Sequence, residues 1–462
     1  IYVSCLGYKQ YLSEPFRVSR DTVIPDIRLR PESFLLDDVI VVGEKQSPSI
    51  KIEGGKMIFT PCNSGITAGS SALEVLKKTP GVFVDGENNI SIGGKNGVLV
   101  ILDGKQTYLP KDELVTLLRA TPSSSVASVE VMHNPSARYD AEGSGGIINI
   151  NMKKSKMEGF FFSLNNGVSY WNHLRENTEI AFSHTKGKFS LSGSYSHTFG
   201  YFDMDYGLHR WQNGKDYYSP TQDTDKRNTV SGNLNMEYAL NERQTIGGRI
   251  NTNTLFGPGI TNTVTEIRDI KSKKLERILY ARNDYYMQKG NRYGGNLYYM
   301  AKPREGVSYM LDFNYAWFDG GSDNRQPNKY LAPDGKVLQD NLYKSVNSRN
   351  IHIYALSYNQ QHPLWNGELK SGLKYSSVRA DNDYRFYNVV NQQESIDRTQ
   401  SNDFGYREQI WAAYMLYAHA IGSKLKLEAG VRGEYTFSDG TLRAVNGRND
   451  EKNKRNYFNL FP

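Results

Sequence analysis

The sequence has little of what marks several common protein classes. It contains two cysteines, Cys5 and Cys62, which are too few for a disulfide framework or a cysteine-based metal site. Its eight histidines are scattered, without the spacing to Cys, Asp or Glu that metal ligands show. No apolar run approaches the roughly 20 residues of a membrane-spanning helix. The formal charge of +7 includes no basic run interleaved with aromatics, so we expect no nucleic-acid partner.

Catalytic and cofactor motifs are also lacking. The glycine-rich stretches 93–97 and 143–146 match neither the phosphate-binding loop nor the dinucleotide fingerprint, so we interpret them as turns and close packing. Residues 85–89 offer oxygen ligands for Ca²⁺ but lack the glutamate that closes an EF-hand loop. We therefore expect no catalytic residues, no metal or cofactor site and no enzymatic activity.

Beyond about residue 155 the sequence is rich in tyrosine and glycine, and apolar and polar residues alternate strictly along it. Apolar and aromatic residues occupy the odd positions of 307–317, and mostly polar residues occupy the even ones. Successive side chains of a strand point to opposite faces, so one face is apolar and the other mostly polar. Stretches 189–199, 230–240 and 425–437 repeat this pattern, and we count about eleven strand candidates from it.

Two folds can carry such strands. A soluble sandwich would bury the apolar faces, whereas a transmembrane barrel turns them toward lipid and lines its lumen with the polar faces. Stretch 425–437 favours the barrel, because charged residues occupy almost every position between its apolar ones and a dry core could not hold them unpaired. The mean hydropathy of −0.60 is compatible with a barrel, since half of each spanning strand faces water. The sandwich stays open as an alternative.

The linkers between the expected strands are of two kinds. Short ones, 187–188 and 241–243, alternate with long polar ones, 200–227, 257–281, 319–347 and 379–403. Outer-membrane barrels have short periplasmic turns and long extracellular loops, so we expect the second kind to be extracellular. These loops hold the aromatics Trp211, Tyr217, Tyr218 and Tyr330, which either contact a ligand or cap the barrel mouth.

The first third of the chain has a different, mixed pattern. Residues 2–8 and 22–29 read as two short strands of a small β-domain. A helix is expected within 70–78, where Ser71 and Glu74 have capping-box spacing, and it should stop before Pro80. A hairpin of 90–92 with 98–102, a second helix over 111–119, a strand over 126–132 and a glycine-rich turn feeding a last strand to 152 complete the region.

Several segments of this region resemble the plug domain of TonB-dependent outer-membrane receptors. They are residues 72–82 (ALEVLKKTPGV), 97–105 (GVLVILDGK), 129–140 (VEVMHNPSARYD) and 142–150 (EGSGGIINI). The form of 134–143 is similar to that of Bacteroidota-type receptors, whose plug follows a carboxypeptidase-regulatory-like β-sandwich. The resemblance implies the end of that sandwich at 1–34, a linker at 35–49, a plug domain at 50–154 and the N-terminal part of a barrel at 155–462.

The fold class implied is mostly β: a small α/β plug followed by part of a large antiparallel transmembrane β-barrel. Barrels of this family have about 22 strands when complete and a plugged lumen. About eleven strands cannot close a barrel of that width, so we expect the sequence to be a fragment, cut at both ends.

The resemblance also implies a partner. Asp38, Val39, Ile40, Val41 and Val42 resemble the TonB box, a strand that adds to the sheet edge of TonB, the inner-membrane energy transducer. The alternative is a plain strand linking two domains.

The function implied is an outer-membrane receptor, surrounded by outer-membrane lipid and lipopolysaccharide, that binds a nutrient ligand outside and imports it with TonB-transduced energy. The ligand class is open among small molecules, glycans and peptides, and the plug and N-terminal domain are expected on the periplasmic side. One alternative is a passive porin or surface adhesin without energised transport. The other is a barrel enzyme, for which we can assemble no converging His, Ser and acidic residues.

Overall fold

The computed structural model divides the chain into two compact units, Ile1–Gln46 and Ser47–Pro462. The residues it describes are 1–3, 11–15, 17, 21, 23–24, 26–30, 49–53, 55–61, 71–85, 89–106, 114–115, 118, 121, 123, 126–133, 145–152, 158–226, 228–422, 425–445 and 450–461. In the first unit, β1 (Tyr2–Val3) pairs antiparallel with β2 (Tyr11–Leu12). The strand expected at 22–29 is wrong, because the residues described there, 23–24 and 26–29, are not in a strand.

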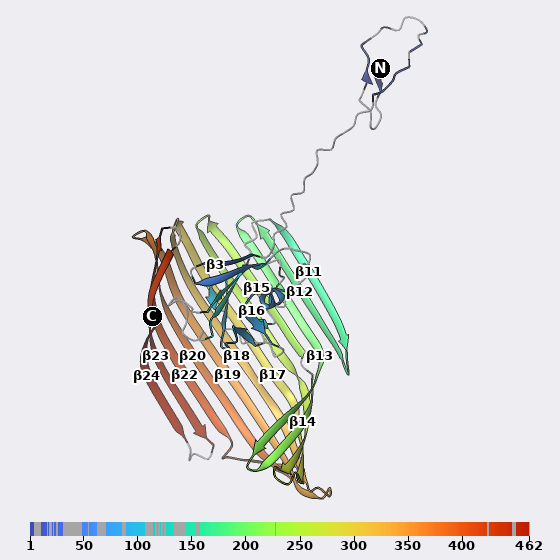
Figure 1. Cartoon of the computed structure of the whole chain (residues 1–462), viewed down its shortest axis with the longest axis vertical. Helices are drawn as coiled ribbons and strands as arrows, with labels where there is room; N and C mark the ends of the chain where they lie inside the picture. Colours follow the sequence, from blue (N-terminus) through green and yellow to red (C-terminus); the bar gives the residue numbers. More distant parts are fainter. Residues whose placement is uncertain are drawn as a thin grey trace. The chain divides into compact units, whose positions relative to one another are not determined.

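The second unit begins with a mixed region, residues 49–152, called here the plug region (Figure 1). Its main sheet has six strands in the order β3-β4-β9-β10-β7-β8. They are β3 (Ser49–Glu53), β4 (Lys56–Thr60), β9 (Val126–Met132), β10 (Ile147–Met152), β7 (Leu99–Leu102) and β8 (Lys105–Gln106). A separate pair consists of β5 (Val82–Val84) and β6 (Ile90–Ile92). The predicted strands at 126–132 and before 152 are confirmed.

The expected first helix is α1 (Ala72–Lys77), and its amphipathic pattern packs against the plug sheet. Ser71 caps it by accepting a hydrogen bond from the Glu74 backbone N–H at 3.4 Å. Leu73 and Leu76 are buried in the core that β9, β10 and β7 share. The helix ends before Pro80, as predicted. Of the second expected helix, Leu114, Val115 and Leu118 are described, and all three are helical and buried.

The hairpin expected between 90–92 and 98–102 is wrong. Strand β6 pairs with β5, whereas β7 pairs in parallel with β10 and antiparallel with β8. The reason is burial: Val100, Ile101 and Leu102 are all at most 7% exposed, so both faces of β7 are covered. A strand with two buried faces needs a central place in a layered domain, which a local hairpin would not provide.

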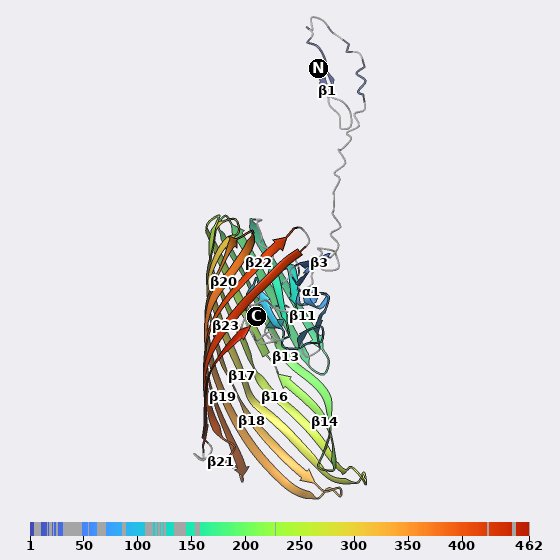
Figure 2. The same ribbon diagram turned by 60° about the vertical axis from the view of Figure 1, so that its left-hand side comes forward.

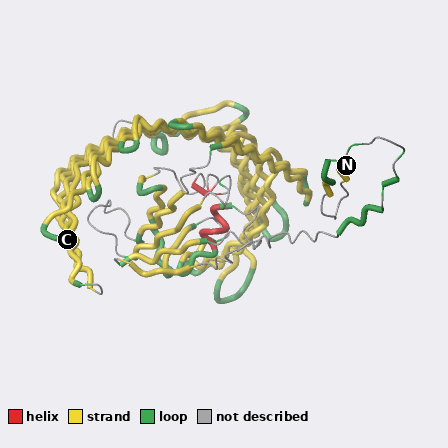
Figure 3. Tube along the Cα trace, turned by 90° about the horizontal axis from the view of Figure 1, so that it is seen from above, coloured by secondary structure: helices red, strands yellow, loops and turns green. Residues whose placement is uncertain are grey.

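The rest of the second unit is one antiparallel sheet of fourteen strands, called here the barrel sheet. Its strands are β11 (Gly159–Tyr170), β12 (Leu174–Lys186), β13 (Phe189–Gln212), β14 (Lys215–Lys226), β15 (Asn228–Asn241), β16 (Gln244–Asp269), β17 (Leu275–Arg304), β18 (Val307–Leu331), β19 (Val337–Leu364), β20 (Gly367–Val390), β21 (Gln393–Ile396), β22 (Asn402–Ile421), β23 (Leu425–Ala444) and β24 (Glu451–Phe461). Seen from above, the sheet curves into an arc around the plug region (Figure 3).

The barrel sheet has fourteen strands where the alternation predicted about eleven. Strands β14 and β15 pair with successive parts of β13, and β21 and β22 pair with successive parts of β20. Each of these pairs therefore counts as one crossing of the sheet, so fourteen strands less two give twelve crossings among the described residues.

The four long polar loops are also corrected. Most residues of 200–227, 257–281, 319–347 and 379–403 belong to strands that continue from the apolar alternation as paired hairpins. Figure 2 shows the hairpins β16–β17 and β18–β19 reaching far past the plug region. Cross-strand backbone hydrogen bonds form without apolar side chains, so a polar stretch can remain a strand when its partner is adjacent.

The barrel sheet is apolar on its outside. On β23, Val431 and Tyr435 are 44% and 46% exposed, whereas Arg432 and Glu434 between them are 3% and 9% exposed. The described residues of both hydrophobic core clusters come from the plug region alone. A sandwich would show the reverse, so the sandwich alternative is wrong. We call the side that carries Val431 the outer face, and the side that carries Arg432 the inner face.

Candidate functional site

The plug region lies within the concave side of the barrel sheet (Figure 3). A tight Asp103–Gly104 turn joins β7 and β8, with both residues at positive φ. Strand β10 holds this turn, since Asp103 Oδ1 accepts the Met152 N–H at 2.8 Å and Asn149 Oδ1 accepts the Gly104 N–H at 2.9 Å. Asp103 also interacts electrostatically with Tyr298 of β17. The inner face is therefore the face that meets the plug.

Polar side chains that hydrogen bond to one another line this inner face. Asn296 Nδ2 donates to Asp312 Oδ2 at 2.8 Å and to Asn314 Oδ1 at 2.9 Å, linking β17 to β18. On β23, the guanidinium Nε of Arg432 lies 2.5 Å from Glu434 Oε1. Buried charges in such an arrangement satisfy one another. The inner wall can therefore face water and a polar plug surface.

The predicted ligand aromatics lie on strands, not in coil loops. Trp211 lies near the end of β13 and Tyr218 lies on β14, and they are 63% and 50% exposed. His209 joins them, with its ring centroid 4.5 Å from that of Trp211 and 5.7 Å from that of Tyr218. Asp216 orients His209 through a 2.5 Å contact from Oδ1 to Nε2. The sequence reading missed His209 and Asp216, because only the strand register brings them together.

The other two aromatics do not join this cluster. Tyr217 is on the opposite face of the β13–β14 hairpin, where the Arg210 guanidinium lies 4.8 Å from its ring centroid. Tyr330 is on β18, which is separated from β14 by β16 and β17 in the sheet order. The structure therefore groups Trp211 with Tyr218 and leaves Tyr217 and Tyr330 elsewhere. A ligand-binding role for any of them stays a prediction.

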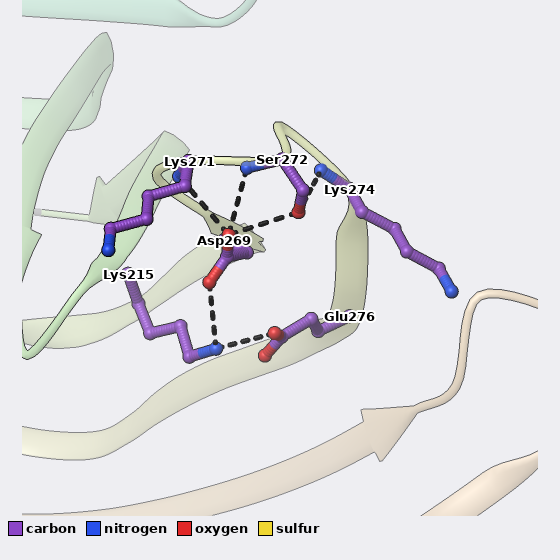
Figure 4. A network of polar contacts seen from close by, with 6 residues as sticks. All are labelled: Lys215, Asp269, Lys271, Ser272, Lys274 and Glu276. Atoms are coloured by element: carbon purple, nitrogen blue, oxygen red, sulfur yellow. Dashed lines mark hydrogen bonds and ion pairs between the residues drawn. The ribbon is translucent and has the colours of Figure 1, made fainter.

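A polar network fixes the tip of the β16–β17 hairpin (Figure 4). One Asp269 carboxylate oxygen accepts the backbone N–H groups of Lys271 and Ser272 and the Ser272 hydroxyl, at 2.9 to 3.1 Å. These hydrogen bonds, those from Ser272 above all, lower the pKa of the Asp269 carboxyl from 3.8 to about 2. Lys215 of β14 bridges Asp269 and Glu276 at 3.5 and 2.5 Å. Its hydrogen bond to Glu276 raises the pKa of Lys215.

Replacing Asp269 by alanine should open this hairpin tip. The tip contains Lys271, Lys273 and Lys274, so we expect trypsin to cleave it several-fold faster, which peptide mass spectrometry of the purified protein would show. In the wild type the carboxylate holds the turn above pH 4 or so, and this protection is lost as the pH falls through about 2.

The control is Lys215→Met, which removes the ion pairs but leaves the hydrogen bonds within the turn. Exposed ion pairs contribute little, so this variant should be cleaved like the wild type. Because Asp269→Ala also removes the ion pair with Lys215, cleavage of Lys215→Met as fast as that of Asp269→Ala would show that the ion pairs hold the tip instead.

Two further observations concern candidate sites. The TonB-box-like segment, Asp38 to Val42, lies outside the described residues. Within the described part of the chain, no group of three or more His, Cys, Asp or Glu residues is placed to hold a metal ion, and no helix is long and apolar enough to cross a membrane.

Two family models match the chain. The model described as TonB-dependent Receptor Plug Domain matches residues 66–147, and the one described as Outer membrane protein beta-barrel family matches residues 301–462. The chain belongs to the TonB-dependent receptor family. It is therefore a protein of the bacterial outer membrane, with its plug on the periplasmic side, and its family is one of transporters and receptors rather than enzymes.

Solved structures of outer-membrane receptors are similar at low identity. The ferric citrate transporter FecA, unliganded, is 12% identical over 90% of this chain and 78% of that chain, with a TM-score of 0.31. The siderophore receptor PiuA from Acinetobacter baumannii is 12% identical over 82% and 70%, with a TM-score of 0.35. The ferric yersiniabactin uptake receptor FyuA from Yersinia pestis is 11% identical over 88% and 78%, with a TM-score of 0.33. No curated protein matches the chain, so the family assignment rests on the two family models.

Proposed function

We propose that this TonB-dependent receptor binds a nutrient ligand on the cell surface and imports it with energy transduced by TonB. The observation that carries the proposal is a separately cored plug region inside a polar-lined barrel wall. A plug in the lumen blocks passive flow, so transport needs the plug to be remodelled, and that remodelling needs an energy source.

The segment Asp38, Val39, Ile40, Val41 and Val42 is the proposed contact with TonB. It precedes the plug region and contains four consecutive β-branched residues, which suit an extended strand. An added strand binds mainly through main-chain hydrogen bonds, so a short segment suffices. We also propose that residues 1–34 are the end of a carboxypeptidase-regulatory-like sandwich, that 35–49 link it to a plug at 50–154, and that the barrel portion is 155–462.

Replacing Val41 by proline should abolish binding of the periplasmic domain of TonB. Proline removes a main-chain donor from the added strand and prevents the ladder from forming. The measurement is the affinity of the detergent-solubilised receptor for purified TonB periplasmic domain, by biolayer interferometry. We expect a loss of at least tenfold, since each missing ladder bond contributes about 1 kcal/mol and the ring also blocks its neighbours.

The matched control is Val41→Thr, which keeps both the N–H group and the β-branched shape and should bind TonB like the wild type. If Val41→Pro binds TonB unchanged, the segment is a linking strand. If the wild type binds no TonB and its solute flux persists without a proton-motive force, the passive porin or adhesin alternative is correct.

A further inference from the structure

An arginine pair stands on the outer face of the barrel sheet. Arg379 of β20 and Arg407 of β22 are directly opposite each other in the antiparallel register. Both are exposed, and the Arg379 side chain is 56% exposed. The register between these strands runs without a shift from Gly367 to Tyr384. The pair therefore shares its face with Trp411, which lies four residues from Arg407.

Two like charges directly opposite on one face of a sheet repel each other, and this destabilises the pairing. The protein compensates for only part of the repulsion. Arg379 Nε bonds Asp381 Oδ2 at 2.9 Å. Arg407 is opposite Asp439 on β23, but that carboxylate already lies 3.3 Å from Lys454 Nζ. Among the described residues, Arg407 makes no ion pair at hydrogen-bonding distance, so this row of the outer face has an excess of positive charge.

The pair lies where the apolar band of the outer face ends. On β22, the outward positions from Arg407 toward the short turn after Ile421 are Gln409, Trp411, Ala413 and Met415. Trp411 packs on Tyr375 of β20, with ring centroids 4.4 Å apart. Aromatic girdles mark the membrane interfaces of such barrels, and short turns mark the periplasmic side. Arg379 and Arg407 are therefore just beyond the girdle on the extracellular side, at the headgroups of the outer leaflet.

We propose that Arg379 and Arg407 bind the phosphate groups of an anionic glycolipid of the outer leaflet. Two guanidinium groups on adjacent strands offer bidentate donors to phosphate oxygens, which neutralises the repulsion between them. The acyl chains of the same molecule lie against Tyr375, Trp411 and the apolar band below. A soluble anion would contact only the two arginines. A phosphorylated glycolipid would contact both the arginines, through its phosphates, and the apolar band, through its acyl chains. The proposal does not depend on energised import.

The test uses the full chain in dodecyl maltoside micelles, titrated with bisphosphorylated lipid A and followed by native mass spectrometry. The variant Arg379→Gln/Arg407→Gln should bind lipid A roughly tenfold to thirtyfold more weakly than the wild type. The reason is that each of the two arginines is expected to contribute a similar share of the binding free energy at a membrane surface. Arg379→Lys/Arg407→Lys should be intermediate, since it keeps the charge but loses the bidentate geometry. Unchanged heat-modifiable mobility would show that each variant is folded.

The matched control is Arg349→Gln. Arg349 is on β19 beside β20, and it is opposite Gly320 on the inner face. This variant should bind lipid A like the wild type, and dephosphorylated lipid A should bind wild type and double variant equally weakly. The proposal is overturned if dephosphorylated lipid A binds the wild type as well as the phosphorylated form, or if Arg349→Gln loses as much affinity. It is also overturned if inorganic phosphate displaces lipid A at equal concentration, which would indicate a soluble-anion site.

Discussion

Cells that express the Gly145→Ala variant are expected to become sensitive to antibiotics too large for ordinary porins, because the plug no longer seals the barrel. A Cβ atom at Gly145 would lie 2.2 Å from the Asn96 carbonyl oxygen, which is a backbone atom with no side-chain freedom to yield. The backbone at this point is already constrained, since the next residue, Gly146, has a φ of +108°. The strand that follows, β10, is central to the plug sheet and pairs with both β9 and β7. Its displacement affects the whole plug core.

The expected cost to plug stability is about 3 kcal/mol, the upper range for overpacking against a rigid neighbour. Amide exchange at Leu99 and Ile148 and susceptibility of the plug to protease would both rise, together with single-channel conductance in planar bilayers.

Gly232→Ala in β15 is the matched control. Its Cβ would meet Thr252 Cγ2 at 3.5 Å, which is ordinary contact, so conductance should stay at the wild-type level. A Gly145→Ala protein with wild-type conductance and exchange would mean that the plug is not held through β10.

Replacing Leu373 by arginine should destabilise the protein in lipid vesicles. Leu373 of β20 is 61% exposed on the outer face, opposite Tyr358 and Ala413. In a transmembrane barrel an arginine facing lipid costs about 2–4 kcal/mol at the middle of the bilayer and about 0–1 kcal/mol at its interfaces. Leu373 lies two residues below the girdle residue Tyr375, so we expect a loss of about 1–2 kcal/mol. Urea titration of the vesicle-inserted protein, followed by heat-modifiable gel mobility, measures this loss in the free energy of unfolding.

The same charge on the inner face should be tolerated. Ser357 of β19 points to the inner face, where its cross-strand neighbours are Asp312 of β18 and Lys374 of β20. Ser357→Arg therefore gains water and a carboxylate neighbour that offsets the repulsion from the lysine. Its unfolding midpoint should stay close to that of the wild type. Equal stability of Leu373→Arg and wild type in vesicles would contradict a lipid-facing outer surface.

The sequence was a good guide to elements whose signal is local. The cap at Ser71 and the stop before Pro80 set α1, and the alternation in 307–317 and 425–437 set the strands and their two faces. It was a poor guide where pairing decided the outcome. The run at 98–102 joined β10 instead of the nearby β6, and the polar linkers became hairpins because a neighbouring strand was present to pair with them.

The candidate functional surfaces also combine residues that the sequence singles out with neighbours that only strand pairing supplies. Trp211 and Tyr218 were singled out as exposed aromatics, but their grouping around His209 depends on cross-strand register. Arg379 and Arg407 are far apart in the chain and unremarkable in sequence, and only the β20–β22 pairing makes them neighbours.

By itself, the amino-acid sequence determined the period-2 pattern and hence that each strand has an apolar and a polar face, because side-chain direction in a strand depends on the local backbone alone. It also determined the plug motifs that resemble the receptor family. Only the tertiary structure decided that the apolar faces stay uncovered and that the polar faces meet the plug. That choice depends on what packs against the sheet, and packing between distant segments leaves no trace in a local pattern.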